Sequence, residues 1–402
     1  MIFMKKYVAM LLLFVLFSLT ACKKEKPVEP ATQPDFATQE MTQDLTNKPT
    51  NPAEPTTKKT EADETENAIK ELISTMTVEE KVGQMFIVRC PVGTGVKDVM
   101  TYKVGGYILF ARDFQNETRD SLKANIKSYQ SASKIPLLIS VDEEGGSVVR
   151  ASKYSQFREN PFPSPLTNYV NGGFELLAKD ATEKSLFLKE LGINMNLAPV
   201  CDLPDFESDY IYKRTLGTDV NVATTGIKTI VEKMEVAGMI STLKHFPGYG
   251  SNVDTHTGIA IDERSYAEFE ANDFLPFKAG IEAGAPCVMI SHNIVNCMDS
   301  TMPASLSPNV NKVLRENLSF DGVIMTDDLA MNAIKLYTGN EQAAVLAVKA
   351  GNDLLCVDDY YIQIPAVINA VKNGEISIGQ IDKSVERILK MKHKYGILRL
   401  KD

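Results

Sequence analysis

The sequence alternates short apolar runs with longer amphipathic segments from about residue 66 onward, and this alternation limits the fold more than any other feature. Short apolar runs bounded by polar or glycine residues are typical of buried parallel strands. The expected strands are 84–88, 106–110, 137–141, 195–200, 240–243, 287–291, 323–326 and 353–357. Expected helices include 119–132, 174–191, 222–237, 266–283, 341–350, 364–373 and 381–395. The pattern predicts a parallel α/β fold.

Two architectures fit this alternation: a closed (β/α)8 barrel of the TIM type and an open, doubly wound sheet. Unusual polar residues appear where several different strands end, and a barrel builds its active site from those positions. We therefore expect a TIM-type barrel, as one catalytic domain over residues 66–402. Thr77 and Glu80 have the spacing of a capping box, which predicts a helix start before the first strand.

The first 22 residues have the pattern of an export signal. Lys5 and Lys6 precede an apolar run over 7–19 that is short for a membrane span, and small residues then lead to Cys22. This is similar to a bacterial lipoprotein signal, in which the cysteine is lipidated and becomes the new N-terminus. We expect an extracytoplasmic enzyme that is lipid-anchored to the cell membrane, the alternative being a plain N-terminal membrane anchor.

Residues 23–65 are rich in Lys, Glu, Pro, Thr and Gln and poor in apolar side chains, which predicts a disordered linker. The net charge of −9 argues against nucleic-acid binding. The cysteines after the linker show no metal-like spacing and lie mostly in apolar runs, so we expect small buried side chains and no disulfide framework. These cysteines are Cys90, Cys201, Cys287, Cys297 and Cys356.

A run from Lys244 to His256 follows the fifth expected strand and holds two of the four histidines in the chain. Lys244 and His245 end the strand, and both side chains can donate hydrogen bonds. A Pro-Gly loop follows and ends in Asp254-Thr255-His256. In extended backbone, residues two apart point the same way, so Asp254 can orient His256 and raise the pKa of its imidazole. That arrangement predicts a proton carrier near neutral pH.

Carboxylates also follow the third and seventh expected strands. Asp142 and two glutamates stand directly after strand three and before a pair of glycines, with Arg150 closing the run. Asp327 and Asp328 end strand seven. Burying a carboxylate at the end of a buried strand costs free energy unless the carboxylate binds a partner. We expect Asp328 to cap or brace the following helix, where the helix dipole favours a negative charge.

These motifs together resemble glycoside hydrolase family 3, and specifically its β-N-acetylglucosaminidase branch, over residues 73–398. The resemblance implies that Asp327 is the nucleophile of a retaining mechanism and that His256, held by Asp254, is the acid and base. It further implies exo-cleavage of terminal β-linked N-acetylglucosamine, for which peptidoglycan fragments are the expected source. The expected substrate-binding residues are Asp142, Arg150, Arg214, Lys244 and His245. Arg214 has an alternative role, which is to brace its loop by pairing with Asp202.

Competing functions remain open. Other branches of the same family are β-glucosidases and β-xylosidases, and a histidine acid also tolerates phosphate as acceptor, which would make the protein a phosphorylase. A non-catalytic, surface-bound sugar receptor is the alternative from a different class. No ligand cluster suggests a metal or an organic cofactor, so none is expected. The expected partners are a carbohydrate substrate and, through the lipid anchor, a membrane; we expect a monomer. The role of His292, which follows strand six, is left open.

Overall fold

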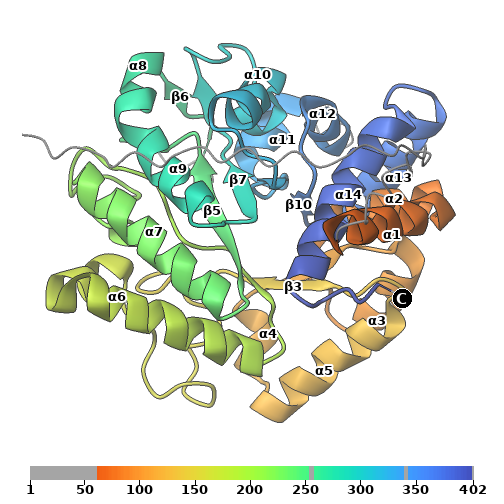
Figure 1. The fold of residues 1–402 in the computed structure, drawn as a ribbon, viewed down its shortest axis with the longest axis horizontal. Coiled ribbons are helices and arrows are strands. Elements are labelled where there is room, and N and C mark those ends of the chain that lie inside the picture. The colour runs from red at the N-terminus through yellow and green to blue at the C-terminus, as the bar shows by residue number, and fades with distance from the viewer. Residues whose placement is uncertain (1–60, 253–257, 339–342, 401–402) are drawn as a thin grey trace, which may run out of the picture. The chain divides into compact units, whose positions relative to one another are not determined.

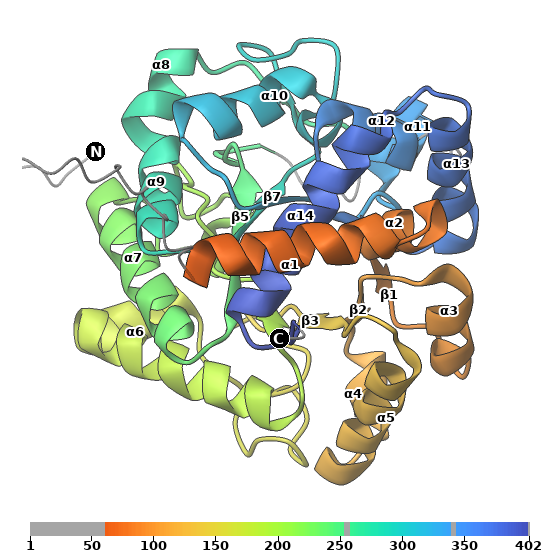
Figure 2. The ribbon, with the colours of Figure 1, turned by 45° about the vertical axis from the view of Figure 1, so that its right-hand side comes forward.

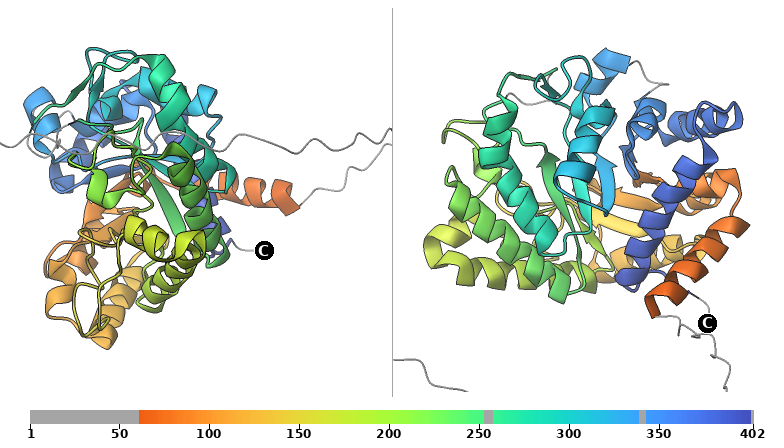
Figure 3. Two further views of the ribbon diagram at one scale, coloured as in Figure 1. Left: turned by 90° about the vertical axis from the view of Figure 1, so that its left-hand side faces the viewer. Right: turned by 45° about the horizontal axis from the view of Figure 1, so that its top comes forward.

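The computed structural model describes residues 61–252, 258–338 and 343–400. Eight parallel strands form one sheet in the order β10-β1-β2-β3-β4-β5-β7-β9. They are β1 (Phe86–Arg89), β2 (Gly106–Leu109), β3 (Leu138–Val141), β4 (Met195–Asn196), β5 (Ile240–Phe246), β7 (Cys287–Ile290), β9 (Val323–Thr326) and β10 (Leu355–Val357). Helices surround this sheet in every view (Figures 1 and 3).

The sheet closes on itself between β9 and β10. Met325 and Leu354 form a parallel bridge. The Thr326 amide donates to the carbonyl oxygen of Leu354 at 3.0 Å, and the Leu354 amide donates to that of Ile324 at 3.0 Å. The ladder at this seam is short, but it joins the first and last members of the sheet order. The predicted TIM-type barrel is therefore confirmed over the open sheet, and the carboxyl ends of all eight strands meet at one face.

Most of the helices that follow the strands bury apolar residues in the core. The helices after the strands are α3 (Gly95–Tyr102), α4 (Arg112–Gln115), α5 (Arg119–Ala132), α6 (Pro165–Glu190), α7 (Val220–Val236), α8 (Tyr266–Glu268), α9 (Phe274–Glu282), α10 (Pro308–Lys312), α11 (Asn332–Thr338), α12 (Ala343–Ala350), α13 (Tyr360–Lys372) and α14 (Ile378–Lys394). The backbone of α6 is not helical at Gly172 and Gly173, so α6 consists of two helical segments, and the expected helix 174–191 matches the second of them. Within the described ranges, no helix combines the length and apolar character that crossing a bilayer requires.

Two further helices precede the barrel. The side chain of Thr77 caps α2 (Val78–Gln84) in a reciprocal capping box with Glu80, as its spacing predicted. The helix α1 (Glu61–Thr75) begins before the predicted linker boundary at residue 66. Its Ile69 and Ile73 are buried in the core, and α1 and α2 both lie against α14 (Figure 2). This packing explains why a charged, linker-like sequence is helical here.

Two smaller differences from the expectations bear on the site. A second, two-stranded parallel sheet joins β6 (Ile261–Asp262) to β8 (Ile294–Val295), and neither strand was predicted because each is only two residues long. The cysteine expectation is wrong for Cys297, which is exposed because it lies in the turn after β8, whereas the other four cysteines of the described part are buried.

Candidate active site

A cleft of about 700 Å³ opens at the carboxyl ends of the barrel strands. Every strand of the barrel contributes a residue to its wall, either from its last positions or from the residue that follows. Those residues are Arg89, Ile108, Asp142, Leu197, Lys244, Met289, Asp327 and Cys356. All of the expected substrate-binding residues and Asp327 line this one cleft, namely Asp142, Arg150, Arg214, Lys244, His245 and Asp327.

Lys244 is a buried cation at the centre of the cleft wall. Its exposed fraction is 2%, and its Nζ contacts Asp142 Oδ1 at 2.8 Å and Glu144 Oε1 at 2.7 Å. Burial lowers the pKa of Lys244, but the negative charges of Asp142 and Glu144 more than offset this, so the net pKa is raised. Lys244 and His245 lie inside β5 rather than after it, since the strand continues to Phe246 past a register irregularity; their shared peptide bond is cis.

Glu144 is a site residue that the sequence interpretation missed. Arg214 donates two hydrogen bonds to its carboxylate, from Nε at 2.9 Å and from a terminal nitrogen at 2.7 Å. Burial raises the pKa of Glu144, but the charges of Arg214 and Lys244 outweigh it, and the net pKa lies well below the ordinary value. Arg214 therefore pairs with Glu144, not with Asp202. Its place in the acidic turn after strand three marked Glu144 as a candidate, but the same signal applied equally to Glu143.

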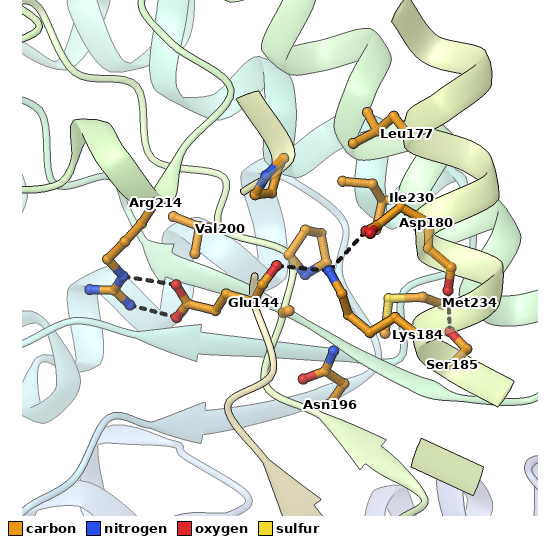
Figure 4. Close-up of a pocket in the computed structure, with 14 residues that line it drawn as sticks. Glu144, Leu177, Asp180, Lys184, Ser185, Asn196, Val200, Arg214, Ile230 and Met234 are labelled. Carbon is orange, nitrogen blue, oxygen red and sulfur yellow. Dashed lines mark hydrogen bonds and ion pairs between the residues drawn. The ribbon is translucent and has the colours of Figure 1, made fainter. Parts of the chain in front are cut away.

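The backbone of Glu144 is fixed by a second buried ion pair beneath the cleft (Figure 4). Lys184, on α6, donates from Nζ to the carbonyl oxygen of Glu144 at 2.9 Å and pairs with Asp180 at 3.0 Å. The neighbouring Glu143 points into the protein, where its carboxylate accepts hydrogen bonds from the amides of Arg150 and Ala151 at 2.9 and 2.8 Å. The two glutamates thus shape the turn that carries Asp142 and Arg150.

His245 is oriented by Asp202, which follows β4. Asp202 Oδ2 lies 2.6 Å from His245 Nδ1, and its other oxygen accepts the amide of Tyr249 at 2.8 Å. Because a carboxylate only accepts, Nδ1 carries the proton in this hydrogen bond. The other ring nitrogen lies 3.3 Å from Arg214. The imidazole is therefore presented to the cleft in a fixed orientation, between Asp202 and the Arg214–Glu144 pair.

Asp327 presents its carboxylate at the end of β9. Its Oδ1 accepts the amide of Asp328 at 2.8 Å. Burial raises the pKa of Asp327, but His292, then His245, the Asp328 amide and Lys244 lower it, and the net pKa lies below the ordinary value. An ionised carboxylate at this position is the state that nucleophilic attack requires.

His292 supports this segment from below. Its Nε2 lies 3.0 Å from the carbonyl oxygen of Asp328, which can only accept, and its Nδ1 lies 2.7 Å from the hydroxyl of Ser305. The side chain is completely buried. His292 therefore fixes the backbone beside Asp327 and does not itself line the cleft.

Asp328 braces the turn after β9; the expectation that it caps or braces the following helix is wrong in detail, because α11 begins only at Asn332 and the Asp328 contacts are to Ala330 and Arg89. Its Oδ1 accepts the amide of Ala330 at 2.9 Å, and its Oδ2 pairs with Arg89 at 3.2 Å. Burial and then the charge of Asp327 raise the pKa of Asp328 to about 6, against the lowering effects of the Ala330 amide and Arg89. The Arg89 guanidinium also stacks 4.4 Å from the ring centre of Phe110, which lines the same cleft.

Three predicted residues fall where the structure makes no statement: Cys22, Asp254 and His256 lie outside the described residues. Among the residues that are described, no group of three or more histidine, cysteine or acidic side chains is arranged to hold a metal ion. The described part of the site thus offers an ionised carboxylate, a set of paired cations and acceptors that suit sugar hydroxyls, and an oriented imidazole.

Comparisons with known proteins agree with this geometry. The family described as "Glycosyl hydrolase family 3 N terminal domain" matches residues 77–391. A protein named "Beta-hexosaminidase" from Tolumonas auensis is 33% identical over 277 residues, which cover 68% of this chain and 81% of that protein. Its namesake from Xanthomonas oryzae pv. oryzae is 35% identical over 266 residues, covering 63% of this chain and 76% of the relative.

Solved structures show the same relationship. A glycoside hydrolase family 3 β-N-acetylglucosaminidase from Paenibacillus sp. str. FPU-7 has a TM-score of 0.75 and 30% sequence identity, covering 82% of this chain and 65% of that chain. This chain thus spans slightly less than two thirds of the Paenibacillus protein. A β-N-acetylhexosaminidase from Beutenbergia cavernae has a TM-score of 0.71 and 26% identity, covering 79% of this chain and 99% of that chain. Because the family match extends over most of its length, the chain belongs to glycosyl hydrolase family 3.

Proposed function

We propose that the protein is a retaining exo-β-N-acetylglucosaminidase that removes terminal β-linked N-acetylglucosamine. The observation that carries the proposal is the position of Asp327, an ionised carboxylate in a cleft that is also lined by the ion-paired side chains of Asp142, Glu144, Arg214 and Lys244. The names of the relatives, β-hexosaminidase and β-N-acetylglucosaminidase, support the same reaction.

In the proposed reaction, Asp327 attacks the anomeric carbon as the bond to the leaving oxygen breaks, which forms a glycosyl-aspartate ester. Protonated His256, oriented by Asp254, gives its proton to the departing oxygen. His256 then takes a proton from water as that water attacks the anomeric carbon, and the Asp327 carboxylate is released. Two displacements on one carbon retain its configuration. The roles of Asp254 and His256 rest on the sequence motif.

The remaining cleft residues are proposed to bind the sugar. Asp142 can accept hydrogen bonds from hydroxyl groups, while Lys244, His245 and Arg214 can donate to hydroxyl or acetamido oxygens. Their mutual ion pairs hold these side chains in place before substrate arrives, which lowers the ordering cost of binding. Arg150 lies 3.6 Å from Asp142 and is proposed to complete the same wall.

The charges of the cleft favour a substrate that carries a carboxylate next to the cleaved sugar. Among the described residues, six lysines and arginines and five carboxylates line the cleft, although the whole chain has a net charge of −9: Arg89, Arg150, Lys213, Arg214, Lys244 and Lys335 against Asp142, Glu144, Asp327, Asp328 and Asp358. Lys213 and Lys335 are exposed at the wall and pair with no carboxylate in the described part. We infer that peptidoglycan fragments, in which N-acetylmuramic acid supplies a lactyl carboxylate, are the natural substrates.

The function is tested with a nitrophenyl β-N-acetylglucosaminide. Asp327→Asn is expected to lose turnover by roughly 10⁴-fold or more, and His256→Ala by about 10²–10⁴-fold. Asp321→Asn, an exposed aspartate that precedes the same strand, is the matched control and should keep wild-type rates. Wild-type turnover by Asp327→Asn would refute the assignment, and circular dichroism checks that the variants remain folded.

Product analysis separates this function from its alternatives. Faster turnover of hydroxy-sugar than of acetamido-sugar aryl glycosides would identify a β-glucosidase or β-xylosidase. Stimulation by phosphate with release of a sugar 1-phosphate would identify a phosphorylase. Binding of N-acetylglucosamine glycosides with no turnover would identify a sugar receptor.

We further propose that the mature protein begins at lipidated Cys22 and is held outside the cytoplasmic membrane, with the residues between Cys22 and α1 as a linker. The support is the basic, apolar and small-residue order of residues 1–22. Growth with a labelled fatty acid should mark the wild-type protein but not Cys22→Ser. Equal labelling of both proteins, or of neither, would refute the anchor.

A further inference from the structure

Arg264 contacts the described residues on both sides of the stretch 253–257. This stretch is the middle part of the connection between β5 and β6, and its sequence includes Asp254 and His256. Arg264 lies two residues after β6, and its guanidinium is packed 4.3 Å from the ring centre of Phe269. The residues before and after the stretch therefore share one side chain as a common support.

On the preceding side, Arg264 holds the Pro-Gly loop. A terminal nitrogen donates to the carbonyl oxygen of Gly248 at 3.1 Å. The guanidinium also fills the space beside Gly250, where a Cβ would lie only 2.6 Å from its central carbon; Gly250 has a φ of +53°. Both glycines are thus required by close packing against the arginine network, since a Cβ on Gly248 would lie 2.2 Å from Asp273.

On the following side, Arg264 is fixed by two buried carboxylates. Its Nε and a terminal nitrogen donate to Asp262, the nearest contact being 2.7 Å, and its other terminal nitrogen donates to both oxygens of Asp273 at 3.0 and 2.9 Å. Asp262 and Asp273 are each 2% exposed. Charge-assisted hydrogen bonds of this kind are strong and directional, so the guanidinium has little freedom.

A second contact ties the two sides directly to each other. The side-chain nitrogen Nδ2 of Asn252 donates to Asp262 Oδ2 at 2.7 Å and to the carbonyl oxygen of Tyr249 at 2.8 Å. Asp262 belongs to β6, which pairs with β8 and is thereby joined to the end of β7. Tyr249 is in turn held by Asp202, the carboxylate that orients His245.

We propose that Arg264 is a positioning residue for proton transfer: it fixes the two ends of the stretch that carries Asp254 and His256 relative to Lys244, His245 and Asp327. The proposal rests on the proposed function, in which His256 is the acid and base. A displacement of about 1 Å in a catalytic group costs on the order of 10²-fold in rate.

The experiment uses aryl β-N-acetylglucosaminides with leaving groups of graded acidity. Proton donation matters most for a poor leaving group and hardly at all for a dinitrophenolate. For Arg264→Lys, kcat/KM is expected to fall about 10–10²-fold with a methylphenyl aglycone and less than about threefold with a dinitrophenyl aglycone. Azide, which needs no general base, should restore kcat on the dinitrophenyl substrate and yield the glycosyl azide.

Two other variants complete the test. Asn252→Ala removes the side-chain hydrogen bond from Asn252 to Asp262 and leaves Arg264 in place. It should show the same leaving-group dependence to a smaller extent, which keeps the proposal testable if Arg264→Lys folds poorly. Arg158→Gln is the matched control, because Arg158 also pairs with a carboxylate, Glu183 at 2.7 Å, and stacks on a ring, Phe162 at 4.1 Å, but lies outside the cleft. It should behave as wild type with every aglycone.

The proposal is overturned if Arg264→Lys and Asn252→Ala lose the same factor with all aglycones, or lose nothing, because a purely structural role does not depend on the leaving group. His256→Ala is measured in parallel on the same substrates. If His256→Ala itself shows no leaving-group dependence, the assignment of the acid is wrong, and that failure is distinct from a failure of Arg264 alone.

Discussion

Arg214 and Glu144 form a doubly hydrogen-bonded ion pair at 2.9 and 2.7 Å, in which the glutamate side chain is 1% exposed. The same carboxylate contacts Lys244 at 2.7 Å. One buried negative charge therefore holds two cations that come from the loop after β4 and from β5. Removing the Glu144 charge would disturb both cations at once, and a buried charge that loses its partner is strongly destabilising.

Replacing Glu144 should therefore affect both stability and binding. Glu144→Gln is expected to lower the free energy of unfolding by about 3 kcal/mol at pH 7, because it removes the carboxylate that pairs with Arg214 and leaves Lys244 with Asp142 alone. It should also raise KM for an N-acetylglucosaminide, since Lys244 and Arg214 lose their orientation. Urea denaturation and steady-state kinetics check the two effects.

The pH dependence of that stability has a defined sign. The folded-state pKa of Glu144 is depressed, so its contribution is fully present above the unfolded value near 4.5 and is lost as the pH falls toward the folded pKa. Glu144→Gln should flatten this acid limb of the stability curve. Glu190→Gln is the control, because exposed Glu190 also pairs with two cations, Arg119 and Lys123, and its loss should change little. Equal effects of the two variants would contradict the account.

Asp202→Asn tests the orientation of His245. The amide keeps the shape of the side chain but replaces a charged acceptor of the His245 Nδ1 proton by a neutral one. Hydrogen bonds to charged groups contribute about 1.5–3 kcal/mol, so kcat/KM should fall by roughly 10–10²-fold. Glu207→Gln, an exposed change in the same loop, serves as the control. Unchanged kcat/KM in Asp202→Asn would show that the imidazole needs no such support.

Lys392 provides a test on the opposite side of the barrel, away from the cleft. It is completely buried and donates to Gln84 Oε1 at 2.8 Å and to the carbonyl oxygen of Gly105 at 2.9 Å. Burial lowers its pKa to about 7, whereas an unfolded lysine titrates near 10.4. Between about pH 7 and 10, the Lys392 side chain binds more protons in the unfolded chain than in the folded one. The titration of Lys392 therefore increases the free energy of unfolding as the pH rises.

The slope expected from Lys392 is at most about 1.4 kcal/mol per pH unit in that window. Lys392→Met should abolish the increase in the free energy of unfolding with pH. Lys383 is an exposed lysine on the same helix, and Lys383→Met should retain that increase. Urea unfolding of the three proteins from pH 6 to 10 measures the effect. A rise that is identical in wild type and Lys392→Met would show that Lys392 stays protonated in the folded state.

The fold was predictable because each barrel strand is a short apolar run that must be buried on both sides. The position of β5 was predicted only in part: Lys244 and His245 are polar, and the sequence gives no sign that the strand continues through them to Phe246. The strands β6 and β8 have two residues each, which is below the length at which periodicity can be recognised.

The site was predicted to the extent that its residues end a strand or match a motif. Asp142, Lys244, His245 and Asp327 all satisfy that condition, and all line one cleft. Glu144 could not be separated from Glu143 by sequence, because both follow the same strand and only the turn geometry sends one toward Arg214 and the other toward the Arg150 amide. Pairings between distant residues, such as Asp202 with His245, depend on the closed barrel and have no local signal.

The most direct test of the central claim is to trap the glycosyl-enzyme with a slow, fluorinated N-acetylglucosaminyl substrate and to map the modified peptide by mass spectrometry. The account predicts one covalent sugar per protein, attached to Asp327 and absent from Asp327→Asn. Attachment to any other carboxylate, or steady hydrolysis with inverted configuration and no covalent adduct, would contradict it.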